Sequence, residues 1–195
     1  LVLTEIVYLP FDEIVPSSFE VKSGISLNQL GEKFETIKEK EHENNPFIIT
    51  KERIQLLEVV SKSPRFKDVK VFGFMNDIDD ELTKQFAAVC YQWEEKSRWI
   101  IFRGTDESLT GWKEDFMMTY SDLIPAQIDA IEYLRKQAEL FSGTLNISGH
   151  SKGGNLSLYA SAMQEEDIQN RIQQIYCWDA PGVHRSILNT EGYQR

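Results

Sequence analysis

The sequence is poor in the residues on which several kinds of functional site depend. It has only two cysteines and three histidines in 195 residues, and they do not follow the spacing of a zinc site. No apolar run approaches the roughly 20 residues that a membrane-spanning helix needs. The first residues, LVLTEIVYLPFDEIV, lack the basic start of a signal peptide. These absences predict a chain with no metal site and no stable insertion into a membrane.

Positive charge is also scarce, and its distribution argues against some partners. The formal net charge is −10, and neither Lys nor Arg forms a run. We therefore expect neither nucleic acid nor an anionic membrane as a partner. Cys90 and Cys177 each lie in an apolar stretch typical of a strand, which predicts two buried free thiols and a cytoplasmic location. The oligomeric state is not predicted.

The order of the sequence patterns predicts an α/β fold. Residues 1–65 have helical spacing, with a helix that opens on Thr50. VKVFGFMND is typical of a strand, and FAAVCYQW and WIIFRG flank a polar turn, which indicates an antiparallel hairpin. Helical and strand patterns then alternate from Pro125 onward. We expect one domain over residues 1–195, in which residues 66–195 form the core around a mostly parallel sheet with flanking helices.

The segment GHSKG, residues 149–153, is a Gly-x-Ser-x-Gly motif between a predicted strand and a predicted helix. In this context Ser151 occupies a sharp, strained turn, and side chains at the two glycines would collide with it. The start of the following helix offers backbone N–H groups to a developing oxyanion. Ser151 is therefore our candidate nucleophile.

Three segments in this order resemble the class-three lipases of the α/β-hydrolase fold: FRGT, a stretch that contains a tryptophan, and GHSKGGN. The nearest resemblance is to the bacterial Mbeg-like hydrolase family. It implies an oxyanion hole made by the backbone N–H groups of Thr105 and Lys152. Lys152 stands where lipases usually carry Leu, and a charged side chain beside Ser151 would disfavour an interfacial lipid substrate. We expect Arg103 to anchor the neighbouring acidic loop, with a catalytic role as the alternative. We expect Trp112 to be a packing residue, with stacking on the substrate as the alternative.

The acid and the base are less clearly marked. Asp179 ends the strand after the Ser151 helix, so it is the candidate acid, with a turn-capping role as the alternative. His184 is the candidate base, although only five residues separate it from Asp179; the alternative is a surface or helix-start histidine. His150 points away from its neighbour Ser151. The resemblance implies further strands and a histidine beyond Arg195, so we expect a fragment that lacks the base.

These patterns predict an esterase-like or lipase-like serine hydrolase. It would cleave a small ester or related acyl substrate through an acyl-enzyme at Ser151, without a cofactor. The alternative is an α/β-hydrolase-like protein that binds a ligand or partner and has no catalytic activity. A phosphate-binding loop is excluded because G-x-x-x-x-G-K-[ST] is absent.

Overall fold

A computed structural model describes residues 1–106 and 108–195. Within these residues a six-stranded sheet has the order β1-β2-β3-β4-β5-β6. The strands are β1 (Ile25–Ser26), β2 (Lys70–Asp79), β3 (Lys84–Glu94), β4 (Ser97–Phe102), β5 (Thr144–His150) and β6 (Ile172–Trp178). The helices are α1 (Val2–Ile6), α2 (Leu27–Glu35), α3 (Lys38–Asn44), α4 (Lys51–Lys62), α5 (Leu109–Met117), α6 (Pro125–Glu139), α7 (Lys152–Ala162), α8 (Glu166–Gln169) and α9 (Glu191–Gln194), with short 3₁₀ helices η1 (Val21–Ser23) and η2 (Arg185–Ile187).

The prediction of a mostly parallel sheet is wrong, because the sheet is mixed. In the described part of the chain β1 to β4 pair antiparallel, and only β4–β5 and β5–β6 are parallel. The physical reason is loop length: short turns join β2 to β3 and β3 to β4, whereas a parallel connection needs a crossover of a dozen or more residues. The predicted hairpin of β3 and β4 is confirmed.

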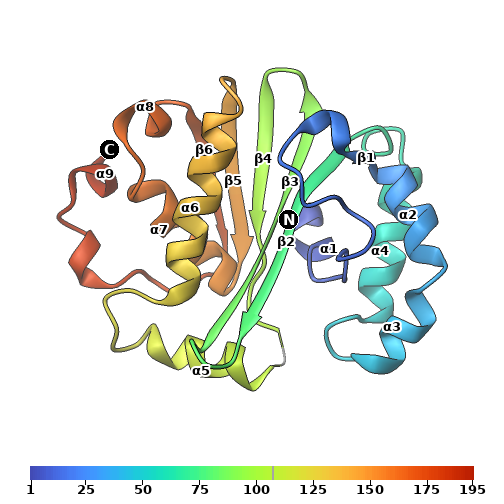
Figure 1. The fold of residues 1–195 in the computed structure, drawn as a ribbon, viewed down its shortest axis with the longest axis horizontal. Helices are drawn as coiled ribbons and strands as arrows, with labels where there is room; N and C mark the ends of the chain where they lie inside the picture. The colour runs from blue at the N-terminus through green and yellow to red at the C-terminus, as the bar shows by residue number, and fades with distance from the viewer. Residues whose placement is uncertain (107) are drawn as a thin grey trace.

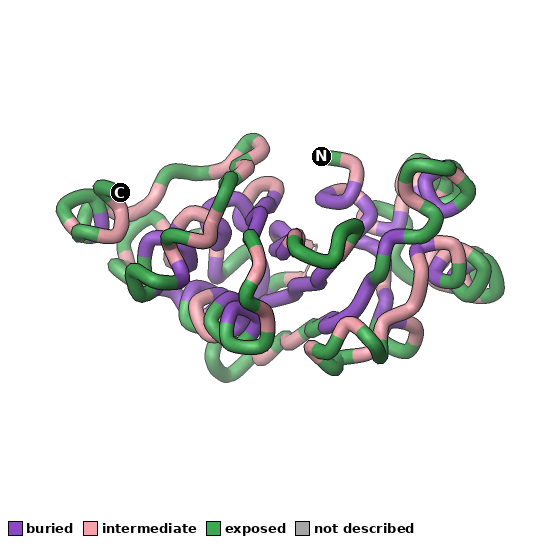
Figure 2. The backbone as a smooth tube through the Cα atoms, turned by 90° about the horizontal axis from the view of Figure 1, so that it is seen from above, coloured by how far each residue is buried: buried purple, intermediate pink, exposed green. Residues whose placement is uncertain are grey.

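Helices cover the sheet on both faces (Figure 1). The N-terminal helices α1, α2 and α4 lie on one side, where a core forms around residues such as Phe34, Tyr91 and Ile101. The helices α6 and α7 lie on the other side, over residues such as Phe102 and Ile147. Neighbouring strand residues serve opposite cores because side chains alternate along a strand. Figure 2 shows the buried backbone running through the middle of the molecule.

Residues 1–65 contain the helices α1 to α4, but residues 7–24 form no α-helix, and the two-residue strand β1 was not predicted. The Thr50 hydroxyl caps α4 by accepting the N–H of Arg53 at 3.2 Å, as the sequence indicated. Cys90 is buried as expected, but Cys177 is exposed because it lies on β6, at the edge of the sheet. Both thiols are free. No helix among the described residues is long and apolar enough to cross a membrane.

The parallel half of the sheet determines where functional groups can meet. β4, β5 and β6 run in the same direction, so the residues that follow them emerge at one edge. These are the loop from Arg103 after β4, Ser151 after β5 and Asp179 after β6. In Figure 1 helix α5 lies below this edge.

Candidate active site

Ser151 occupies a tight turn between β5 and α7, as the sequence predicted. Its φ of 54° and ψ of −129° lie outside the helical and extended regions, and its N–H donates to the Trp178 carbonyl oxygen at 2.9 Å. A Cβ at Gly149 would lie 2.1 Å from the backbone of Gly153, and one at Gly153 would lie 2.2 Å from the Phe102 carbonyl oxygen. The motif therefore needs both glycines to let α7 approach the strands closely.

The loop after β4 passes directly beside this turn. A Cβ at Gly104 would lie 3.3 Å from the Cβ of Ser151, which places the loop on the same edge of the sheet. The Thr105 hydroxyl donates to both carboxylate oxygens of Asp115, each at 2.7 Å. Burial raises the pKa of Asp115, and the hydrogen bond from Thr105 opposes that shift. Within residues 1–106 and 108–195, the N–H groups of Thr105 and Lys152 donate to no backbone carbonyl.

The Lys152 side chain does not lie in the open beside the nucleophile, so the sequence-based argument from its charge is wrong. It points into the interior and is fully buried, as is Glu114 on α5. Its Nζ lies 2.7 Å from Glu114 Oε2. Burial lowers the pKa of Lys152, and the carboxylate of Glu114 opposes the shift. The surface near Ser151 consequently does not carry this positive charge, and an apolar substrate is not disfavoured by it.

The expectation for Arg103 is confirmed, whereas the expectation for Trp112 is wrong. Arg103 is buried and donates to Asn76 Oδ1 at 3.0 Å and to Asp106 Oδ2 at 3.4 Å, which confirms its anchoring role. Trp112 is not a packing residue, because it is 58% exposed. The reason is its position on the outer face of α5, which also exposes Leu109 and Phe116.

His150 points away from the nucleophile as expected. Its Nδ1 lies 3.0 Å from the Tyr8 hydroxyl, which belongs to the segment directly after α1. Burial raises the pKa of Tyr8 to about 12, so this hydroxyl stays protonated at neutral pH. The same hydroxyl borders Gly104, since a Cβ there would lie 2.2 Å from it. Tyr8 thus supports the turn and the loop after β4, a contact that no local sequence pattern indicates.

The residues after β6 are less well connected. Asp179 is exposed and has a φ of 46°, and it directly follows Trp178, whose carbonyl oxygen binds the Ser151 N–H. His184 is the N-cap residue that precedes η2, and its Nδ1 lies 3.0 Å from Asp122 Oδ1. Among the described residues no hydrogen bond joins His184 to Ser151 or to Asp179. The structure brings Asp179 to the edge that carries Ser151, but it pairs His184 with a different carboxylate.

Comparison with known proteins identifies the family. A family model described as Mbeg1-like matches residues 60–195. The chain belongs to the Mbeg1-like family. A search of curated proteins found no match.

Similar solved structures include several lipases. A fungal lipase in an inhibitor complex is 19% identical, with a TM-score of 0.48 over 71% of this chain and 57% of that chain. The lipase of Rhizopus microsporus var. chinensis is 18% identical, with a TM-score of 0.43 over 66% and 48%. A Rhizomucor miehei lipase propeptide complex is 16% identical, with a TM-score of 0.45 over 88% and 57%. The Mbeg1-like chain therefore spans about half the length of the lipases it matches.

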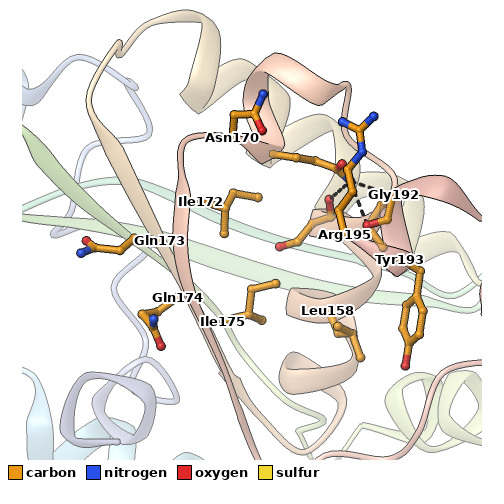
Figure 3. Close-up of a pocket in the computed structure, with 12 residues that line it drawn as sticks. Leu158, Asn170, Ile172, Gln173, Gln174, Ile175, Gly192, Tyr193 and Arg195 are labelled. Atoms are coloured by element: carbon orange, nitrogen blue, oxygen red, sulfur yellow. Dashed lines mark hydrogen bonds between the residues drawn. The ribbon is translucent and has the colours of Figure 1, made fainter.

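Two pockets of this Mbeg1-like chain differ in where they lie relative to the predicted site residues. The pocket in Figure 3, of about 380 Å³, lies between α7, β6 and α9 and contains none of the five predicted site residues. A second pocket, of about 460 Å³, is lined by Tyr8, Arg103 and Asp106 beside the loop after β4. Within the described residues no three His, Cys, Asp or Glu side chains could together hold a metal ion.

Proposed function

We propose that this chain is an esterase-like or lipase-like serine hydrolase that cleaves an ester or related acyl bond. The observation that carries the proposal is the strained turn at Ser151, with a φ of 54° between a strand and a helix. A non-glycine residue rarely adopts such a conformation, and strain of this kind clusters at functional sites. The loop that holds Thr105 lies against the same turn, which supports the assignment.

The proposed reaction follows from these groups. Ser151 Oγ attacks the carbonyl carbon of the substrate while a base accepts its proton. The negative charge that develops on the carbonyl oxygen binds the N–H groups of Lys152 and Thr105. The intermediate collapses to an acyl-Ser151, and the alcohol leaves with the proton from the base. Water then attacks the acyl-enzyme by the same route and releases the acid.

Asp179 is the proposed acid, and His184 is the candidate base among the described residues. The position of Asp179 supports its role, because it extends from the strand whose last carbonyl binds the Ser151 N–H. His184 Nδ1 lies 3.0 Å from Asp122 Oδ1, but the same nitrogen accepts the Ser186 N–H at 3.3 Å, so Asp122 does not orient the ring as the acid of a triad does. At this position His184 has no hydrogen bond with Ser151 in the described part of the chain, and we expect it to contribute little to the rate.

We propose a small acyl ester as the substrate. Gly111 on the buried face of α5 borders the Thr105 side chain, so this helix lies beside the proposed oxyanion hole. Leu109, Trp112 and Phe116 on the exposed face of the same helix would favour an acyl group. We also propose a bacterial, cytoplasmic protein, which the two free thiols support.

A non-catalytic binding protein is the second candidate. It is favoured by one observation: no histidine in the described part of the chain forms a hydrogen bond with Ser151. Such a protein would bind ligands at the same edge of the sheet without acyl transfer.

Hydrolysis of p-nitrophenyl acetate distinguishes the two candidates. The wild-type chain is expected to release nitrophenol slowly, because the hydroxyl lacks a hydrogen-bonded base, and Ser151→Ala is expected to abolish this activity. Equal rates for both proteins, with ligand binding retained, would favour the non-catalytic candidate.

A further inference from the structure

A buried ion pair lies behind the turn that carries Ser151. Lys152 Nζ donates to Glu114 Oε2 at 2.7 Å, to the Gln85 carbonyl oxygen at 2.7 Å and to Gln85 Oε1 at 2.6 Å. An ammonium group has three N–H donors, so its hydrogen-bonding capacity is filled. Buried ion pairs add little net stability over apolar side chains of similar volume, but this one fixes the residue directly after Ser151.

Glu114 is itself held by two backbone groups. Its Oε2 accepts the N–H of Gln85 on β3 at 3.1 Å, and its Oε1 accepts the N–H of Ala126 on α6 at 2.9 Å. The carboxylate thus joins β3, α5, α6 and the start of α7. An anchor with this many fixed contacts leaves Lys152 little freedom to shift.

The same turn of α5 also holds Thr105. Asp115, the next residue after Glu114, accepts both hydrogen bonds from the Thr105 hydroxyl. Two consecutive residues of one helix therefore bind the side chains of Thr105 and Lys152. Those are the residues whose N–H groups are proposed to bind the oxyanion, so α5 determines how far apart the two donors lie.

We propose that Glu114 is a positioning residue, whose ion pair with Lys152 holds the Lys152 N–H in place relative to the Thr105 N–H. This inference rests on the proposed function. Glu114 does not touch the substrate; it acts through Lys152 on the Ser151 turn. The pairing matters most in the transition state, because the charge on the oxyanion develops there.

The test compares the wild-type chain with Glu114→Gln/Lys152→Met. Each single substitution leaves one buried charge unpaired and is expected to impair folding. The double variant removes both charges and keeps the side-chain lengths, but its Gln amide accepts only one of the two backbone N–H groups that the carboxylate binds. We therefore expect it to fold with an unfolding equilibrium constant raised about 5- to 150-fold, a loss of about 1–3 kcal/mol in the free energy of unfolding. Lys113→Met is the matched control, because Lys113 is an exposed lysine on the same helix.

Two measurements reveal positioning rather than stability. Amide hydrogen exchange at Ser151, whose N–H donates to the Trp178 carbonyl oxygen, should accelerate about tenfold more in the double variant than exchange at the amides of the distant helix α4, which report any loss of global stability. The kcat for p-nitrophenyl acetate should fall about 100-fold at unchanged KM, because the misplaced donor acts only in the transition state. Lys113→Met should match wild type in both measurements.

The outcomes separate this inference from the proposed function. A stably folded double variant with wild-type exchange and kcat would overturn the positioning role. A wild-type chain without Ser151-dependent turnover would overturn the proposed function instead. The exchange measurement needs no activity, so in that case it alone decides whether the ion pair holds the turn.

Discussion

The turn at Ser151 and the segment after β6 lie at the same edge of the sheet but differ in how they are held. Side chains around the turn are bonded across the fold: the buried Lys152 to the buried Glu114, and the half-buried Thr105 to the half-buried Asp115. After β6, Asp179 is exposed, and the partner of His184, Asp122, is 76% exposed in its side chain. The part of the proposed site around Ser151 is therefore held by contacts across the fold, and the part after β6 is held by fewer of them.

This difference indicates which part of the chemistry the described structure supports directly. A nucleophile and oxyanion donors require fixed geometry, because a displacement of about 1 Å costs roughly 100-fold in rate. The region around Ser151 meets that requirement through long-range contacts. The segment after β6 has few comparable contacts, so its side chains are less restricted.

The largest expected difference between the two regions is in stability. Gly149→Ala would place a Cβ 2.1 Å from the Gly153 backbone, whereas Gly182→Ala meets nothing within 4 Å. We expect the first to lower the free energy of unfolding by at least about 3 kcal/mol and the second to change it by less than about 0.5 kcal/mol. Urea unfolding measures both. Similar losses for the two variants would show that the regions are equally constrained.

The next difference is in catalysis. Thr105→Val removes the hydrogen bonds to Asp115 and should lower kcat for p-nitrophenyl acetate about 100-fold, because an oxyanion donor loses its support. His184→Ala should change kcat less than about threefold, since His184 forms no hydrogen bond with Ser151 in the described structure. A loss from His184→Ala as large as that from Thr105→Val would establish His184 as the base.

The smallest expected effect concerns pH. Burial raises the pKa of Asp115 in the folded chain, so the folded state binds this proton more tightly than the unfolded state. Its contribution to stability is therefore gained as pH falls through the raised pKa and is lost at neutral pH. Asn does not titrate. We therefore compare the free energy of unfolding of wild type with that of Asp115→Asn. The difference, wild type minus variant, should increase as the pH is lowered from about 7 to about 4.5. Asp179→Asn serves as the control, because Asp179 is exposed. If the difference in the free energy of unfolding between wild type and Asp115→Asn did not change with pH, the effect of burial on Asp115 would be contradicted.

The range of each interaction explains what the sequence could predict. The turn at Ser151 depends on glycines within two residues of it, so the motif alone indicated its conformation. The ion pair joins Lys152 to Glu114, 38 positions away, and no local pattern connects them. The exposure of Trp112 likewise depends on which face of α5 meets the sheet.

The fold, too, was predictable from local patterns only in part. The alternation of helices and strands after Pro125 correctly indicated the parallel half of the sheet. The sequence also predicted the antiparallel hairpin of β3 and β4, but it did not predict that β1 and β2 continue the antiparallel half, so the sheet is mixed and not mostly parallel. The Asp122 contact of His184 was not predictable either, because α6 and α7 separate the two residues in the sequence.

The most direct test of the account is covalent labelling of Ser151 with a fluorophosphonate, located by mass spectrometry of peptides. The account predicts that one adduct forms slowly, on Ser151, in the folded chain and that none forms after denaturation, because the fixed turn and its N–H groups stabilise the charge that develops during attack. The matched variant Ser151→Ala should remain unlabelled. A folded wild-type chain that carries no adduct on Ser151, or that is labelled equally at other serines, would contradict the assignment of Ser151 as the nucleophile.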